Sequence, residues 1–166
     1  MNASPPPSPI GPEQAALISR PISIIVGSRD ARQRPHLMRA VGCRLAADRR
    51  RLTIFMPQGS GQAVLQDLRD NGQIAVVFSE PSSHRTLQLK GSDATVSPCA
   101  PEDAAEVEAY LQGFVEEIGQ LGFAAEVAHT MLRHDDALVA VHFTVGAAFE
   151  QTPGPAAGEP LAPAAG

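Results

Sequence analysis

The alternation of apolar and polar residues along the chain predicts a mostly β structure. Short apolar runs that alternate or are rich in β-branched residues, bounded by turn residues, are typical of strands. Such runs occupy residues 22–28, 37–46, 52–56, 73–79, 86–91 and 138–145. The run 86–91 is the clearest, because Leu87 and Leu89 fall on one face and polar residues on the other. We expect the first three strands to form an antiparallel meander.

Apolar residues at helical spacing predict four helices. They cover residues 13–19, 60–70, 101–118 and 123–133. Asn71 and Gly72 supply the left-handed residue that ends the second helix, and in the last helix Val127 and Leu132 are expected to face inward. A doubly wound sheet would need a helix after nearly every strand. The pattern therefore predicts a mainly β (α+β) fold, a small antiparallel barrel with flanking helices.

The two ends of the chain differ from its middle in composition. Five of the 15 prolines lie within residues 4–12, and four more lie among Ala and Gly within residues 153–163. Such segments bury too little apolar surface to offset the entropy lost on ordering. With 166 residues and a hydrophobic fraction of 43%, the chain is expected to form one domain at 13–152. Residues 1–12 and 153–166 are expected to be flexible tails outside the core.

Charge and composition argue against several classes of function. A net charge of −5, no Trp and 4% aromatic residues do not suit nucleic-acid binding. No apolar run approaches the roughly 20 residues of a membrane helix, and the N-terminus lacks a signal-peptide pattern, so a cytoplasmic protein is expected. The five histidines and the cysteines Cys43 and Cys99 lack metal-ligand spacing, and the thiols are expected to be free and buried.

Motifs for hydrolysis and for dinucleotide binding are also missing. The sequence contains neither Gly-x-Ser-x-Gly nor Gly-x-Gly-x-x-Gly. The acidic residues of the helix at 101–118 are expected to form its solvated face. They are Glu102, Asp103, Glu106, Glu108, Glu116 and Glu117.

One turn is compatible with anion binding. Gly59, Ser60 and Gly61 follow the strand at 52–56 and open a helix, whose first N–H groups and positive dipole end favour a phosphate. The alternative is that Ser60 simply caps the helix. Arg39, this turn, Thr86 and Gln88 together form a polar lining, or else are ordinary solvent-facing positions.

The order of these motifs resembles the pyridoxamine 5′-phosphate oxidase-like FMN-binding split-barrel family. The resemblance rests on segments 34–42 and 52–56, on Ser60 and its helix ending at Asn71 and Gly72, and on segments 74–78 and 85–91. It covers roughly residues 22–96. It implies a six-stranded antiparallel split β-barrel that forms a homodimer, with FMN bound between the subunits.

The resemblance also assigns residues to the cofactor. The expected FMN-binding residues are Met38, Arg39, Ala40, Val41, Met56, Pro57, Ser60, Gln62, Thr86 and Gln88. Members often carry Arg-Lys after the serine of the turn, whereas this chain has Gly61 and Gln62, which removes two cations from the phosphate site. No catalytic acid or base is identified.

The expected function is that of an FMN-dependent oxidoreductase acting on a small molecule, with a nicotinamide cofactor as a transient electron donor. A second possibility is a non-catalytic protein that stores flavin or haem. A third is a dimeric module that holds no cofactor. An absorption spectrum of the purified protein distinguishes these three.

Overall fold

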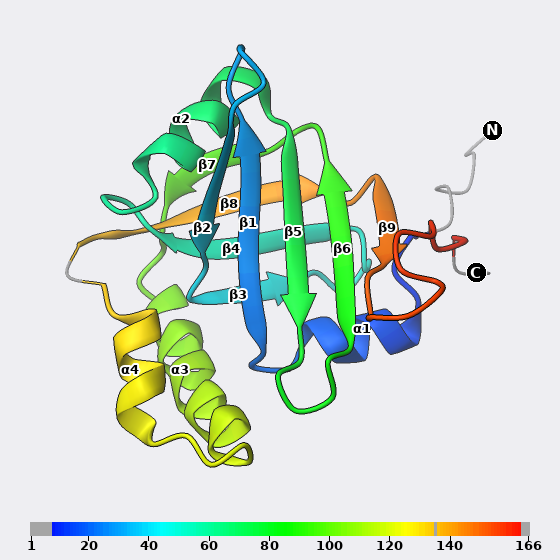
Figure 1. Ribbon diagram of the computed structural model, residues 1–166. Helices are drawn as coiled ribbons and strands as arrows, with labels where there is room; N and C mark the ends of the chain where they lie inside the picture. Colours follow the sequence, from blue (N-terminus) through cyan, green and yellow to red (C-terminus); the bar gives the residue numbers. More distant parts are fainter. Residues whose placement is uncertain (1–7, 135, 164–166) are drawn as a thin grey trace.

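Two antiparallel sheets form the body of the protein in a computed structural model, which describes residues 8–134 and 136–163 (Figure 1). The five-stranded sheet has the order β2 (Pro35–Arg39), β1 (Ser23–Arg29), β5 (Ile74–Ser79), β6 (Thr86–Gly91) and β9 (Ala147–Glu150). The four-stranded sheet has the order β3 (Gly42–Leu45), β4 (Arg51–Pro57), β8 (Leu138–Thr144) and β7 (Thr95–Pro98). In Figure 1 the five-stranded sheet stands in front of the other.

In the described residues four helices flank the sheets: α1 (Pro12–Ile18), α2 (Gln62–Asn71), α3 (Asp103–Gly119) and α4 (Ala125–Leu132). Helix α2 ends as predicted, because Gly72 adopts a φ of 66° and its N–H donates to the Leu68 carbonyl. Helices α3 and α4 pack together at one end of the molecule (Figure 1). Leu132 is buried as expected, but Val127 is 37% exposed and Ala128 is the fully buried residue of that turn.

The predicted strand at 37–46 is two strands in different sheets. The Ala40 N–H donates to the Ile24 carbonyl of β1, and the Val41 N–H donates to the Phe55 carbonyl of β4. The chain therefore crosses from one sheet to the other at this corner, and the predicted meander is wrong. Since Ala40 and Val41 are both buried, the corner looks in the sequence like a continuing strand.

The strand number also differs from the prediction. Strands β7 and β9 were not predicted and the predicted strand at 37–46 is split in two, so residues 8–134 and 136–163 contain nine strands rather than six. Among the described residues, no ladder of hydrogen bonds joins the edges of one sheet to the other. The predicted barrel is thus a pair of facing sheets that exchange strands at corners.

The core lies between the sheets and consists of the inward-facing residues of alternating strands. Fully buried members include Ile24, Val26, Ile54, Val76, Phe78, Leu89 and Val141. Burying one such side chain contributes roughly 1.5–3 kcal/mol. Ile10 is also fully buried, and Leu161 packs against the core. Both residues lie in segments that were predicted to be outside the domain. The prediction missed them because a high proline content does not reveal a single buried apolar residue.

Two acids of α3 are buried, contrary to the expected solvated face. Glu117 is 3% exposed and accepts hydrogen bonds from the Ser82 N–H at 3.2 Å and the Ser82 hydroxyl at 2.6 Å. Its other oxygen pairs with Arg20, which also pairs with buried Glu80. A buried carboxylate is tolerated when cations and N–H or O–H donors satisfy it.

Asp103 is buried in the same way. Its Oδ2 accepts the Ala100 N–H at 2.8 Å, and its Oδ1 pairs with Arg44. Desolvation raises the pKa of Asp103, but the hydrogen bonds from Arg44 and Ala100 outweigh it, so this pKa lies below its usual value. The ion pair attaches the start of α3 to β3.

The two cysteines are free thiols, and each residue is half-buried. Desolvation, assisted by the charge of Glu106, raises the pKa of Cys43 to about 12. The pKa of Cys99 is raised as well, again chiefly by desolvation. A thiol whose pKa is raised is a poor nucleophile at neutral pH.

Candidate functional site

The turn between β4 and α2 is the feature that the sequence singled out, and the structure shows it as an open helix N-terminus. Helix α2 starts at Gln62, its N-cap is Gly61, and no side chain in the described part of the chain caps it. Ser60 is exposed and, within the described residues, its hydroxyl has no hydrogen-bond partner. Simple capping by Ser60 is therefore not what this side chain does. The hydroxyl is available to a ligand.

Gly61 allows the turn to close against its neighbours. A Cβ atom at this position would lie 2.7 Å from the Pro57 carbonyl oxygen, which already accepts the Gly61 N–H at 3.2 Å. The same atom would lie 3.5 Å from Met56 Cε and 3.7 Å from Met38 Cγ. The structure thus brings Met38, Met56 and the turn together.

Several predicted site residues can contact a ligand only through their backbone, or not at all. Met56 and Pro57 are buried, and so are Ala40 and Val41, whose N–H groups already donate to other strands. Six of the ten predicted residues keep an accessible side chain. These are Met38, Arg39, Ser60, Gln62, Thr86 and Gln88.

The accessible residues lie on two faces of the molecule. Strand register places Arg39 opposite Ile25, Ile25 opposite Val77 and Val77 opposite Gln88, in one row across the outer face of the five-stranded sheet. Arg39 and Gln88 are three strand spacings apart, about 14 Å. Met38 points to the opposite face of β2, toward the turn. One chain does not bring all six residues to a single point.

The polar groups on this outer face are partly engaged. Arg39 Nη1 donates to Ser23 Oγ at 2.9 Å, and the Thr86 hydroxyl donates to the His84 carbonyl at 3.0 Å. Gln88 Oε1 accepts from Gln151 Nε2 at 3.4 Å. Each is held in position but retains capacity for a further partner.

The rest of that outer face is apolar or small. Ile25, Gly27, Ala75 and Val77 are half-buried, and none of the described helices crosses in front of them (Figure 1). A hollow of about 440 Å³ lies over Gly27 and Ala75, beside Leu37, whose side chain is 72% exposed. This surface is not typical of a face that remains in water.

Two contacts at the site were not predicted. The carboxylate of Asp136 accepts the Gly59 N–H, so it brings a negative charge to the turn where a phosphate is expected. It comes from the segment before β8, more than 70 residues away, and no local pattern in the sequence signals it.

The second unpredicted contact is a buried carboxylate beside β2. Asp67 of α2 is 4% exposed, and its Oδ2 lies 2.7 Å from Ser28 Oγ and 2.7 Å from His36 Nδ1. Because an ionised carboxylate only accepts hydrogen bonds, Nδ1 of His36 is the donor and Nε2 is left for other contacts. Asp67 fixes α2 against β1 and β2, and so fixes the turn that precedes it.

Metal and membrane features are not found in the described part of the chain. Within residues 8–134 and 136–163, no three His, Cys, Asp or Glu side chains are arranged to hold a metal ion. Every described helix is too short or too polar to cross a lipid bilayer.

Similarity to known proteins is visible in structure rather than in sequence. No protein-family model and no curated protein matches the chain. HupZ of Group A Streptococcus has a TM-score of 0.54 at 19% identity, covering 90% of this chain and 99% of that one. A protein described as F420 reductase has a TM-score of 0.55 at 12% identity, covering 84% and 98%.

A third solved structure is a putative pyridoxamine 5′-phosphate oxidase from Lactobacillus delbrueckii. Its TM-score is 0.52 at 14% identity, covering 84% of this chain and 93% of that one. The structural neighbours are thus split-barrel proteins like pyridoxamine 5′-phosphate oxidase, which confirms the predicted resemblance. At these identities the likeness concerns the fold.

Proposed function

We propose that the protein binds FMN at the turn before α2 and acts as an oxidoreductase on a small molecule. The observation that carries this proposal is the open N-terminus of α2 on a split-barrel fold, where the Ser60 hydroxyl has no partner among the described residues and the adjacent Gly61 lies against Met38. The names of two structural neighbours, a putative pyridoxamine 5′-phosphate oxidase and an F420 reductase, support redox chemistry on this fold.

The residues at the turn fit a phosphate through uncharged donors. The Ser60 hydroxyl and the positive end of α2 both favour an anion. Met38, half-buried next to Gly61, offers a soft apolar surface to a flat ring. Gly61 and Gln62 replace the two cations common in relatives, and Asp136 adds a like charge. The phosphate is therefore expected to contribute less affinity than in a site with cations.

When bound, FMN would supply hydride or single-electron transfer. The chain's own residues would position it: Ser60 would donate to the phosphate, and Met38 would pack against the ring. Asp67 would hold α2, and with it the turn, in place through His36 and Ser28.

We further propose that the active form is a homodimer. Arg39, Thr86 and Gln88 share the outer face of the five-stranded sheet, while Ser60 and Met38 lie on the other side of β2. A second copy seated on that outer face would bring residues of both sets to one ligand at the edge of β2. Such obligate interfaces commonly exceed about 2,000 Å².

The test is a comparison of FMN with riboflavin, which lacks the phosphate. Wild-type protein should bind FMN at least about tenfold more tightly, because a hydrogen bond to a charged group contributes roughly 1.5–3 kcal/mol. Ser60→Ala should remove most of that preference and leave riboflavin binding unchanged. Asp136→Asn should strengthen FMN binding alone. Ser92→Ala, at an exposed serine of the β6–β7 connection, is the matched control.

Three outcomes would contradict the proposal in different ways. Equal affinity for FMN and riboflavin would show that the turn does not hold a phosphate. A Soret band in the purified protein would support the haem-storage alternative. A protein without a chromophore that also fails to bind added FMN would leave only a structural module.

A further inference from the structure

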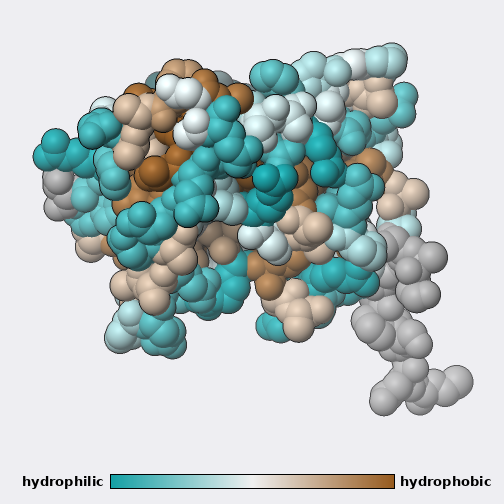
Figure 2. Space-filling view, turned by 90° about the horizontal axis from the view of Figure 1, so that it is seen from below, coloured by the Kyte–Doolittle hydropathy of each residue, from teal (hydrophilic) through white to brown (hydrophobic). Residues whose placement is uncertain are grey.

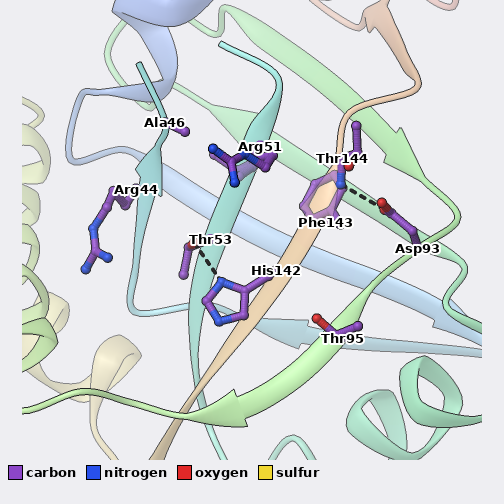
Figure 3. Close-up of a pocket in the computed structure, with 10 residues that line it drawn as sticks. Arg44, Ala46, Arg51, Thr53, Asp93, Thr95, His142, Phe143 and Thr144 are labelled. Atoms are coloured by element: carbon purple, nitrogen blue, oxygen red, sulfur yellow. Dashed lines mark hydrogen bonds between the residues drawn. The ribbon is translucent and has the colours of Figure 1, made fainter. Parts of the chain in front are cut away.

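A second cleft, of about 540 Å³, lies on the outer face of the four-stranded sheet (Figure 3). Helix α3 covers another part of this face, where its Val107 and Tyr110 lie against Gly42, the strand partner of the fully buried Phe55. The open part is lined at the Arg51 end of β4, whereas the turn of the proposed cofactor site follows Pro57 at the opposite end. The cleft is therefore separate from that site.

One row of polar side chains crosses the floor of the cleft. The register places Arg44 opposite Thr53, Thr53 opposite His142, and His142 opposite Thr95. The imidazole is held at both nitrogens, because Nδ1 lies 2.9 Å from Thr53 Oγ1 and Nε2 lies 2.9 Å from Ser97 Oγ. A ring fixed in this way forms a rigid floor rather than a mobile surface side chain.

The next row carries opposite charges at its two ends. Arg51 lies opposite Thr144, and the Thr144 N–H donates to Asp93 Oδ1 at 2.8 Å. Figure 3 shows the arginine on one side of the cleft and Asp93 on the other. Arg51 uses only Nε, with Asp48 at 3.1 Å. Within the described residues its two Nη groups and Asp93 Oδ2 have no partner.

Arg44, the other arginine of the cleft, is not available in the same way. Its guanidinium pairs with Asp103 and with Glu106, and it lies over the Phe55 ring, 5.5 Å from the centroid. Two carboxylates therefore offset its charge. Among the described residues that line the cleft, Arg51 is the one available cation and Asp93 Oδ2 the one available carboxylate oxygen, with the hydroxyls of Thr95 and Thr144 nearby.

We propose that this cleft binds a small zwitterion of about dipeptide length, with its carboxylate on Arg51 and its ammonium group on Asp93. A guanidinium fork matches a carboxylate with two parallel hydrogen bonds, and an ammonium group donates to carboxylate and hydroxyl oxygens. The strand of Arg51 and the segment of Asp93 are separated by about two strand spacings, roughly 10 Å. That separation suits charges at two ends of a short chain, and the cleft volume falls within the usual range for small-molecule sites.

The experiment uses calorimetric titration of the full chain with glycylglycine and two analogues that each lack one charge. Glycylglycine amide lacks the carboxylate, and N-acetylglycylglycine lacks the ammonium group. Wild-type protein should prefer glycylglycine over each analogue by about tenfold or more, as expected for one lost charge-assisted contact. Arg51→Gln should abolish the preference over the amide only. Asp93→Asn should abolish the preference over the acetylated analogue only.

Arg32→Gln, at an exposed arginine of the β1–β2 turn, is the matched control and should behave as wild type. Both cleft residues are exposed, so circular dichroism should show that their variants fold. No binding of glycylglycine at millimolar concentration would overturn the proposal. So would equal binding of all three compounds, or a loss of preference that does not follow this pairing of variant and analogue. The result does not depend on FMN.

Discussion

The outer faces of the two sheets differ in what covers them and in which side chains they carry. On the four-stranded sheet, α3 covers Phe55, and the uncovered part carries arginine, threonine and histidine. On the five-stranded sheet no described helix covers the centre, yet that centre carries Ile25, Ala75 and Val77. Figure 2 views the molecule from below and shows apolar side chains among the hydrophilic ones on that side as well.

The difference shows how a sheet face is matched to its surroundings. A face that remains in contact with water carries polar residues, and a face that stays apolar is usually covered by something. The four-stranded sheet obtains its cover from its own chain. The five-stranded sheet does not, which is why we place a second copy there and the small-ligand cleft on the other sheet.

The largest expected effect comes from placing a charge on the apolar face. Val77→Glu should raise the dissociation constant of the proposed dimer by about a hundredfold or more, because an unpaired charge in an interface costs several kcal/mol. Light scattering should then report 17.4 kDa in place of twice that mass. Thr95→Glu makes the same change on the polar face and should leave the dimer intact. Equal masses for the two variants would contradict the inference that only the apolar face forms the dimer interface.

A smaller effect is expected from removing the ion pair between Arg44 and Asp103, which attaches α3 to the four-stranded sheet. Because its pKa is depressed, Asp103 stabilises the fold above its unfolded value of about 4 and loses that contribution as pH falls through the lower folded value. Arg44→Gln should cost roughly 1–3 kcal/mol at neutral pH. Thermal melts should show the gap between wild type and variant shrinking as pH falls below about 4. A gap that stays constant with pH would contradict this assignment.

The smallest effect is expected on the polar face itself. Thr53→Val removes one hydroxyl from His142 but leaves the exposed imidazole free to bond water. The free energy of unfolding should change by less than about 0.5 kcal/mol in a urea titration. A loss well above this value would mean that the row of polar residues stabilises the fold, and the two faces would then differ less than we infer.

Much of the fold follows from local pattern. The strand Thr86–Gly91 has its predicted bounds, and Gly72 ends α2 as predicted. In these cases the deciding interactions lie within a few residues. Strands β7 and β9 have four residues each and no clear alternation, so only their pairing with β8 and β6 makes them strands.

The candidate site was less predictable, because its contacts join distant segments. Asp136 contacts Gly59 and Asp67 contacts His36, and no short-range spacing signals either contact. The sequence grouped Arg39 with Ser60, but alternation along β2 places Arg39 and Met38 on opposite faces. To separate Arg39 from the turn, one would need to know which face of β2 packs against the turn, and the sequence does not show this. The FMN-binding residues themselves stay a prediction.

The C-terminal segment after β9 has a consequence for the behaviour of the protein at high concentration. Residues 158–161 run back along β9: Gly158 donates to the Glu150 carbonyl at 2.7 Å, and Leu161 donates to the Ala148 carbonyl at 2.8 Å. Phe149 faces Pro160, which has no N–H to offer to a further strand. The open edge of the five-stranded sheet is thus blunted by a proline. This segment guards against edge-to-edge aggregation, which an exposed β9 would invite.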